Sequence, residues 1–244
     1  MKIPFTFYAI AVILSISSCK DDKEGSFTLH FKPLYDGQPL QMFSIRPGTG
    51  AEQIQFTHLS FLIADAKLLT PSGKHDLSDI EYVDLSFDAL PDAEEGYEIK
   101  FNGVPAESYV GVALGVGVPP DLNSKTPAEF ASSHPLSKTG YYWQAWDSYI
   151  FMKIEGRLDT LGNGNFDTTF SYHTGSNDLY RMLEGIVDIN VEGGKNEDLN
   201  IAIDYKELLE GINIRANPQN HNPEDTVQID RIVNNLQQSI ILFP

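Results

Sequence analysis

The sequence contains one cysteine in 244 residues, and its 17 basic residues are outnumbered by 34 acidic ones. A single cysteine excludes an internal disulfide framework and every metal site built from several thiolates. The formal net charge of −17 argues against nucleic acid as a partner, because binding to a phosphate backbone requires a basic patch. We therefore expect no nucleic-acid partner.

The common catalytic motifs are also missing. The sequence has no glycine-rich loop opening a helix, no His-Glu-x-x-His and no Gly-x-Ser-x-Gly. The acidic residues are so numerous that paired carboxylates cannot be told from chance pairs. We therefore expect a protein that is not an enzyme. A hydrophobic fraction of 41% is nevertheless enough to fill a core, which argues against global disorder.

The single cysteine follows a short apolar segment near the N-terminus. Met1-Lys2 is a basic start, and Phe5–Ile16 is an apolar run that is too short to span a membrane and has the length of a signal-peptide core. The run ends in Ile16-Ser17-Ser18-Cys19, which is similar to the lipobox of bacterial lipoproteins, where the thiol carries lipid. We predict a lipoprotein signal peptide over residues 1–18 and lipidation at Cys19.

The residues after the cysteine are charged, with the sequence Lys20-Asp21-Asp22-Lys23-Glu24. This segment is similar to the export signal of surface lipoproteins of Bacteroidota, and it is equally typical of the solvated tether that any lipoprotein needs. We predict an acidic lipid-anchored tether over residues 19–26 and a single domain over residues 27–244. The acyl chains would hold the protein at the outer membrane, with the domain on the cell surface or facing the periplasm.

From Ser26 onward the dominant period of the sequence is two, as expected of half-buried strands. Strands are predicted at residues 26–32, 55–69, 80–87, 97–104, 109–118, 148–158, 166–173, 187–191 and 199–205. In the strand over 109–118, one face is apolar and the other carries Gly111, Ala113, Gly115 and Gly117. Another group must therefore approach the backbone of this strand closely.

Turns follow at regular intervals, and helix is scarce. Gly162-Asn163-Gly164 and Gly193-Gly194-Lys195-Asn196 are predicted hairpin turns. One helical turn is expected at residues 206–211, and apolar residues at helical spacing from Ile229 to Ile240 predict a helix after Glu224-Asp225-Thr226. The predicted fold is all-β, an antiparallel β-sandwich with Greek-key-like topology and a short C-terminal helix.

Two loops carry features that could be functional. Residues 119–140 form the longest irregular stretch, and loops of that length are usually functional or mobile. A second loop carries oxygen-bearing side chains at calcium-like spacing, namely Asp159, Asn163, Asn165 and Asp167. Leu161 occupies an essential ligand position and no glutamate closes the loop, so a hairpin turn is the better interpretation.

Histidines and tryptophans are the remaining candidates for chemistry. The six histidines are His30, His58, His75, His134, His173 and His221. The two tryptophans, Trp143 and Trp146, lie in a segment that is most often sandwich core. His173 ends a strand whose apolar face is formed by Phe166, Phe170 and Tyr172. Its imidazole therefore points to the other face, where it can reach a partner from another strand.

The predicted strand pairing determines how far His173 lies from Trp146. If the strands over 148–158 and 166–173 pair through a turn near Asn163, His173 lies opposite residues 152–154. Trp146 then lies roughly 20 Å further along if the strand is straight, at ~3.3 Å per residue. A site that combines His173 with Trp146 therefore requires the chain to bend back near Asp147-Ser148.

Four segments carry a resemblance to a known family. The first begins Leu29-His-Phe-Lys-Pro-Leu-Tyr-Asp-Gly, and the second is Phe56–Leu69. The third is Val104-Pro-Ala-Glu-Ser-Tyr-Val-Gly-Val-Ala-Leu-Gly-Val-Gly-Val-Pro. The fourth begins Tyr142-Trp-Gln-Ala-Trp-Asp-Ser-Tyr and is taken together with Phe170-Ser-Tyr-His-Thr-Gly-Ser. In their order and spacing these segments resemble the MbnP-like proteins of methanobactin cassettes. The resemblance implies a secreted β-sandwich protein that is often encoded beside a dihaem cytochrome c peroxidase-like partner.

The resemblance also implies a metal. Relatives in methanotrophs bind copper through histidines and a tryptophan that has been oxidised to kynurenine, whose aryl amine is a better ligand than an indole nitrogen. On this resemblance, His173 is the implied copper ligand, and His134 in the long loop is a second candidate. Trp143 or Trp146 is the implied oxidisable residue.

Two other functions remain open at this stage. Tyr141, Tyr142, Trp143 and Trp146 could form an aromatic platform for a glycan or another protein, since aromatic rings stack on apolar faces without a metal. A structural accessory of an outer-membrane TonB-dependent transporter is the third interpretation.

Overall fold

The structure is a computed structural model that describes residues 23–220 and 226–243. The predicted signal peptide, Cys19, His221 and Glu224-Asp225 lie outside the described residues. The strands are β1 (Glu24–Tyr35), β2 (Gln38–Pro39), β3 (Arg46–Pro47), β4 (Gln53–Thr70), β5 (Gly73–Asp84), β6 (Tyr97–Pro105), β7 (Ser108–Val116), β8 (Tyr142–Trp143), β9 (Ser148–Asp159), β10 (Thr168–Gly175), β11 (Arg181–Asn190), β12 (Asn196–Asp204), β13 (Gln219–Asn220) and β14 (Ile240–Phe243).

Helices are short, as the sequence predicts. The α-helices are α1 (Leu90–Glu95), α2 (Pro120–Asn123), α3 (Tyr205–Leu208) and α4 (Val227–Ser239), and single 3-10 turns lie at Pro127–Glu129, Pro135–Ser137, Thr139–Tyr141 and Asn177–Leu179. The predicted C-terminal helix is confirmed as α4, which buries Ile229, Ile232 and Leu236 on one face. In the part of the chain that the structure describes, no helix is long and apolar enough to cross a membrane.

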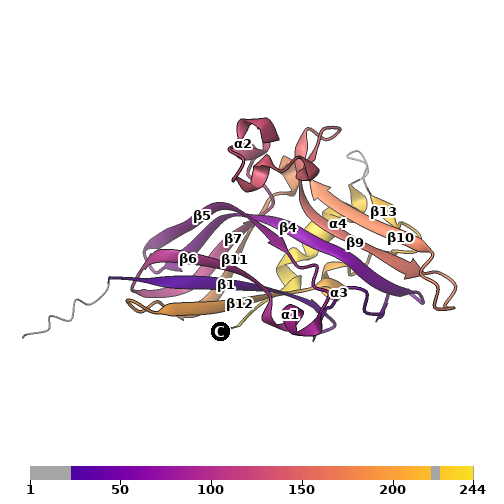
Figure 1. The fold of residues 1–244 in the computed structure, drawn as a ribbon, viewed down its shortest axis with the longest axis horizontal. Coiled ribbons are helices and arrows are strands. Elements are labelled where there is room, and N and C mark those ends of the chain that lie inside the picture. The colour runs from indigo at the N-terminus through magenta and orange to yellow at the C-terminus, as the bar shows by residue number, and fades with distance from the viewer. Residues whose placement is uncertain (1–22, 221–225, 244) are drawn as a thin grey trace, which may run out of the picture.

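The strands of the described chain form a smaller and a larger sheet that enclose one core (Figure 1). The smaller sheet has the order β14-β12-β1-β2, with β6 also paired to β1. The larger has the order β11-β7-β4-β9-β10-β13, with β3 and β5 on β4 and β8 on β9. Aromatic rings pack between the sheets, as where Phe31 meets Phe61 edge-on at 5.6 Å. The predicted all-β sandwich is confirmed.

The pairing of β12 differs from a simple antiparallel sandwich. β12 runs parallel to β1, with Ser26 opposite Asn196 and Leu34 opposite Asp204. The predicted hairpin turn at residues 193–196 is wrong, because β11 belongs to the larger sheet and β12 to the smaller one. The two glycines instead carry the chain from sheet to sheet, and Gly194 donates its N–H to the carbonyl of Glu24 at 2.9 Å. That contact lies at the start of β1, which begins inside the predicted tether.

The bare face of β7 receives close neighbours, as predicted. A methyl group on Gly115 would lie 2.0 Å from the hydroxyl oxygen of Tyr180, and one on Gly111 would lie 2.3 Å from the carbonyl oxygen of Gly185 in β11. The other face of β7 places Val112 and Leu114 in the core. Glycine at these two positions therefore lets the Tyr180 ring and the Gly185 backbone approach β7 more closely than any larger side chain would.

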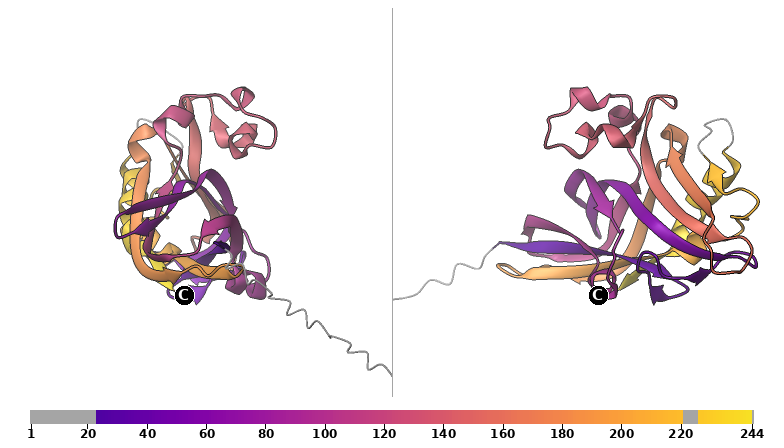
Figure 2. Two further views of the ribbon diagram at one scale, coloured as in Figure 1. Left: turned by 90° about the vertical axis from the view of Figure 1, so that its left-hand side faces the viewer. Right: turned by 45° about the vertical axis from the view of Figure 1, so that its right-hand side comes forward.

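The long segment over residues 119–140 is built from α2 and three 3-10 turns. It projects beyond the two sheets at one end of the molecule (Figure 2). The buried side chain of Asn123 anchors it: its carbonyl oxygen accepts from the N–H of Tyr149 at 2.8 Å, and its amide donates to Ser148 Oγ at 3.1 Å. The Tyr149 hydroxyl in turn donates to the carbonyl of Leu136 at 2.9 Å.

One prediction follows from the packing of β9. A methyl group on Gly156 would lie 2.3 Å from the carbonyl oxygen of Gln55 and 2.3 Å from Cζ of Phe170. We expect Gly156→Ala to lower the free energy of unfolding by about 1–3 kcal/mol, because the methyl group overpacks the core. Gly140→Ala is the control, since nothing lies within 4 Å of its added methyl group. Urea denaturation measures both, and equal stabilities of the two variants would contradict this packing.

Candidate functional site

The chain bends back immediately before β9, as a combined site requires. β8 pairs antiparallel with the start of β9, so that Trp143 lies opposite Ser148. Asp147 closes the turn in the left-handed region with φ = 50°, and its carboxylate accepts a hydrogen bond from the Tyr142 hydroxyl at 2.6 Å. Asp is one of the few residues other than glycine that adopt this conformation readily. The bend therefore places both tryptophans beside the start of β9 and the end of β10.

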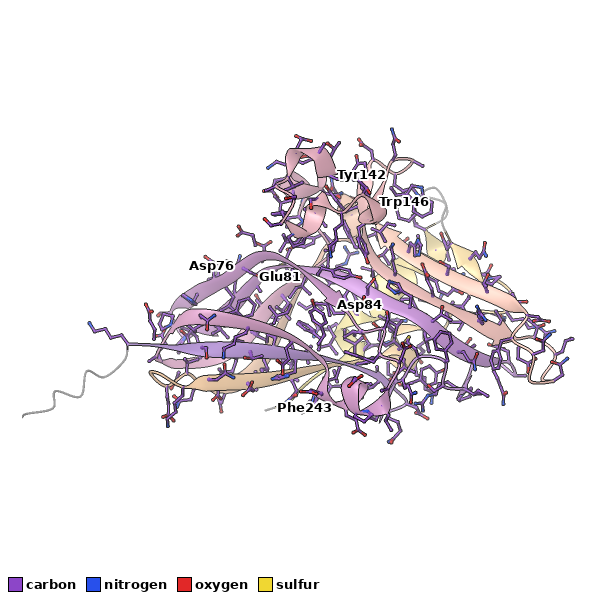
Figure 3. All side chains as sticks on the ribbon, in the orientation of Figure 1. Asp76, Glu81, Asp84, Tyr142, Trp146 and Phe243 are labelled. Atoms are coloured by element: carbon purple, nitrogen blue, oxygen red, sulfur yellow. The ribbon has the colours of Figure 1, made fainter. Side chains whose placement is uncertain are left out.

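The bend stacks the two tryptophans on each other. The ring centroids of Trp143 and Trp146 lie 4.9 Å apart with planes only 5° from parallel. Trp143 in turn meets the His173 ring edge-on at 5.9 Å. Trp146 packs against Gly175, where a methyl group would come within 2.7 Å of the indole. Figure 3 shows Trp146 and Tyr142 close to the projecting segment, above the ends of β9 and β10.

His173 lies on β10 opposite Lys153, within the range that the strand spacing predicts. Its strand neighbour Tyr172 is fully buried in the core, so the imidazole points to the outer face of the larger sheet. Only 9% of His173 is exposed. Its Nε2 donates a hydrogen bond to Glu155 Oε1 at 2.7 Å, which fixes the orientation of the ring.

Glu155 is the member of the site that our sequence analysis missed. It lies on β9, opposite Ser171 of β10 and opposite His58 of β4. The hydrogen bond from His173 lowers the pKa of the Glu155 carboxyl, and the nearby charges of His173, His58 and Lys153 lower it further. Strand alternation puts Lys153 and Glu155 on one face, so pairing the predicted hairpin residue by residue would have revealed this carboxylate.

His58 belongs to a neighbouring polar group on the same face. Its Nδ1 is hydrogen-bonded to Ser86 Oγ at 2.9 Å, and its Nε2 to Ser60 Oγ, also at 2.9 Å. Both ring nitrogens are thus engaged within the sheet. The remaining influence of His58 on the site is electrostatic, through the pKa of Glu155.

The two tyrosines of the predicted aromatic platform pack away from the tryptophans. The Tyr141 ring lies 4.8 Å from that of Tyr82, and the Lys153 ammonium lies 4.2 Å from the Tyr141 ring centroid. Burial lowers the pKa of Lys153, whose Nζ also donates to the carbonyl of Gly140 at 3.0 Å. Tyr142 instead meets Tyr149 edge-on at 5.1 Å. Each tyrosine therefore has its own aromatic partner, separate from the tryptophan stack.

His134 has its own surroundings in the projecting segment. Its ring stacks on Phe130 at 4.4 Å, and its Nδ1 accepts a hydrogen bond from the N–H of Leu136 at 3.1 Å. Burial lowers the pKa of its imidazole. Within residues 23–220 and 226–243, no group of three or more His, Cys, Asp or Glu side chains is arranged to hold a metal ion. Neither His134 nor His173 therefore belongs to such a group among these residues.

The loop with calcium-like spacing is a hairpin turn, as preferred on its sequence. It connects β9 to β10, which pair antiparallel. The buried carboxylate of Asp159 accepts hydrogen bonds from the backbone N–H groups of Leu161, Asn163 and Gly164, the last at 2.6 Å. These bonds hold the pKa of Asp159 below its ordinary value against the opposing effect of burial. The carboxylate thus serves the turn itself.

The lowered pKa of Glu155 gives a prediction about stability. A carboxyl group whose pKa is lower in the folded state stabilises the fold above its ordinary pKa of 4.5, and this contribution is lost as the pH falls through the folded-state value. We expect Glu155→Gln to be less stable than the wild type at neutral pH and to approach it under acidic conditions. Chemical denaturation across this pH range measures the difference. A difference that grows on acidification would contradict the assignment.

Comparison with known proteins shows the family to which the chain belongs. The family model of MbnP matches residues 24–225. Among solved structures, MbnP from Methylosinus trichosporium is similar, with a TM-score of 0.55 and 14% sequence identity over 77% of this chain and 78% of that one. At that identity the likeness shows a shared fold. A search of curated proteins finds no match. Because the family match covers most of the sequence, this chain belongs to the MbnP family.

Proposed function

We propose that this protein is a non-catalytic, copper-binding lipoprotein of the cell envelope. In this proposal, oxidation of Trp143 or Trp146 to kynurenine completes the copper site. The observation that carries the proposal is the continuous contact from Trp146 through Trp143 to His173. Family membership supports it, since the resemblance implies copper, histidine and an oxidised tryptophan.

The ligand atoms available near His173 explain why oxidation of a tryptophan would precede copper binding. His173 offers imidazole, which suits copper well, and Glu155 is the carboxylate that orients it at 2.7 Å. An intact indole nitrogen has its lone pair in the ring and is a poor ligand. The described residues around Trp143 therefore fit copper only in part while the tryptophans are intact. An aryl amine formed beside His173 would add the missing nitrogen donor.

The oxidation can be written as a balanced reaction. The C2–C3 bond of one indole breaks and each carbon gains one oxygen atom, which come from dioxygen or from two peroxide molecules that release two waters. Hydrolysis of the resulting formamide consumes one water, releases formate and leaves the free aryl amine of kynurenine. We propose that a dihaem cytochrome c peroxidase-like partner catalyses this step, with dioxygen or peroxide as the oxidant. The stacked indoles would share the positive charge of a one-electron intermediate.

The chain's own residues would prepare this step. The turn at Asp147 holds both indoles in one stack, and the segment anchored by Asn123 holds the turn. Trp146 packs against Gly175 of β10, and Trp143 stacks on Trp146 next to His173. Metal capture or handling, without turnover of a substrate, is the role that we propose for the completed site.

The aromatic platform is the weaker candidate on this geometry. A ring platform requires faces that lie side by side, whereas Trp143 covers one face of Trp146 and Tyr141 packs against Tyr82. No further observation favours the transporter accessory.

The first test is a mass measurement on one peptide. Lys138 and Lys153 bracket both tryptophans, so trypsin releases them together in the peptide Thr139–Lys153. In protein from its native membranes, we expect this peptide to have gained one oxygen atom and lost one carbon atom, at Trp143 or Trp146. Two unmodified tryptophans, in cells grown with copper and expressing the haem partner, would contradict the proposal.

Copper affinity provides the second test. In the oxidised protein, we expect His173→Ala to abolish copper binding and Glu155→Gln to weaken it by about 10- to 100-fold, the usual effect of removing an orienting partner. His75→Ala, on β5, is the control and should bind as the wild type does. Competition with a copper chelator measures all three. Unchanged affinity in His173→Ala would overturn the site assignment.

A further inference from the structure

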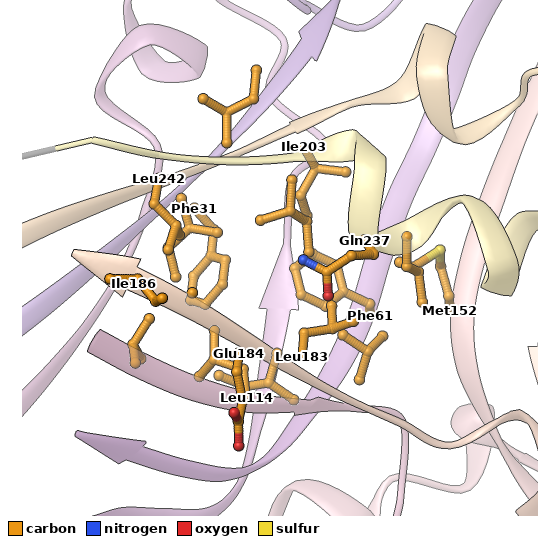
Figure 4. Close-up of a pocket in the computed structure, with 18 residues that line it drawn as sticks. Phe31, Phe61, Leu114, Met152, Leu183, Glu184, Ile186, Ile203, Gln237 and Leu242 are labelled. Carbon is orange, nitrogen blue, oxygen red and sulfur yellow. The ribbon is translucent and has the colours of Figure 1, made fainter. Parts of the chain in front are cut away.

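A large cavity lies between the two sheets, on the face of the larger sheet opposite to the tryptophan stack. Its volume is about 530 Å³, which is within the range of small-molecule sites. Its lining comes from both sheets and from α4 with the following β14 (Figure 4). The cavity thus lies inside the sandwich, where tightly packed side chains would ordinarily leave only small voids.

The lining is almost wholly apolar. Phe31, Phe61, Leu114, Leu183 and Ile203 contribute to it, and among the described residues no lysine or arginine does. Figure 4 shows these side chains between Leu242 and Ile186 at one end of the view and Met152 at the other, with the amide of Gln237 among them. The Glu184 carboxylate points away from the centre in the same view. The lining thus offers one neutral hydrogen-bonding side chain, that of Gln237, which is itself exposed to solvent.

The cavity is partly open to solvent, and an edge of each sheet lies beside it. β11 is one edge of the larger sheet and β14 one edge of the smaller sheet, and Leu242 packs directly on the backbone of Gly185 between them. Exposed apolar side chains surround this opening: Ile186 is 93% exposed and Ile241 46%. An apolar molecule would thus find apolar surface both outside and inside the mouth.

We propose that this cavity binds a single-chain alkyl molecule with an uncharged polar end, such as a long-chain alcohol. An apolar space of this volume suits an alkyl chain, and the exposed Gln237 amide can both donate to and accept from a hydroxyl group. A phospholipid is disfavoured, because the described lining residues offer no cationic side chain for a phosphate and the chain carries a net charge of −17. The copper proposal neither requires nor predicts this site.

Photolabelling of the full-length protein in isolated membranes tests this proposal. The probe is a long-chain alcohol that carries a photoreactive diazirine on its alkyl chain. We expect label in the tryptic peptides Phe101–Lys125, Met182–Lys195 and Ile232–Pro244, which contain the lining residues of β7, β11 and β14. Leu183→Trp fills the cavity and should reduce this labelling by about tenfold or more.

Met182→Trp is the matched control. Met182 is the neighbouring residue on β11, is 44% exposed and points to the opposite face of the strand, so labelling should be unchanged. If Leu183→Trp unfolds, Leu114→Phe fills the same space from β7 and replaces it, with a thermal melt verifying folding. Equal labelling of a folded cavity variant and the wild type would overturn the proposal. Equally efficient labelling by a diazirine-bearing phosphatidylcholine would overturn the single-chain assignment.

Discussion

The buried side chain of Asn123 is the interaction on which the arrangement of the site depends. It joins three segments that are distant in sequence: its own helical turn, the start of β9 through Ser148 and Tyr149, and the 3-10 turn after β10 through Asn177, to which it donates at 2.9 Å. Ser148 Oγ completes the junction by accepting from the N–H of Ser176 at 2.9 Å. A buried amide that satisfies both its oxygen and its nitrogen in this way rigidifies its surroundings.

The position of the tryptophans follows from that junction. Ser148 is both a partner of Asn123 and the residue opposite Trp143 in the short β8–β9 pair. The same junction fixes the chain just beyond His173, where β10 ends. One hydrogen-bonded centre therefore sets the approach of the indoles to the imidazole from two directions, whereas either strand alone would leave their separation undetermined.

Much of this architecture could be predicted from the sequence because strand alternation is a local signal. The strands around Phe27, Val112 and Tyr172 and the helix around Ile232 follow directly from the spacing of apolar residues. The parallel partner of β1 could not be predicted, because pairing between distant strands depends on the whole sandwich. The hairpin predicted at Gly193-Gly194 failed for that reason, since a turn signal does not specify the sheet that the next strand joins.

The parallel pairing of β1 with β12 also has a consequence for folding. Ser26 is hydrogen-bonded to Asn196, although the two are 170 residues apart in the chain. The central pair of the smaller sheet cannot form until nearly the whole chain is available, and contacts of such high sequence separation make folding slow. Until then β1 exposes an unpaired, apolar edge that is prone to aggregation. Chaperone protection of the nascent N-terminal strand therefore matters more for this protein than for a sandwich built from successive hairpins.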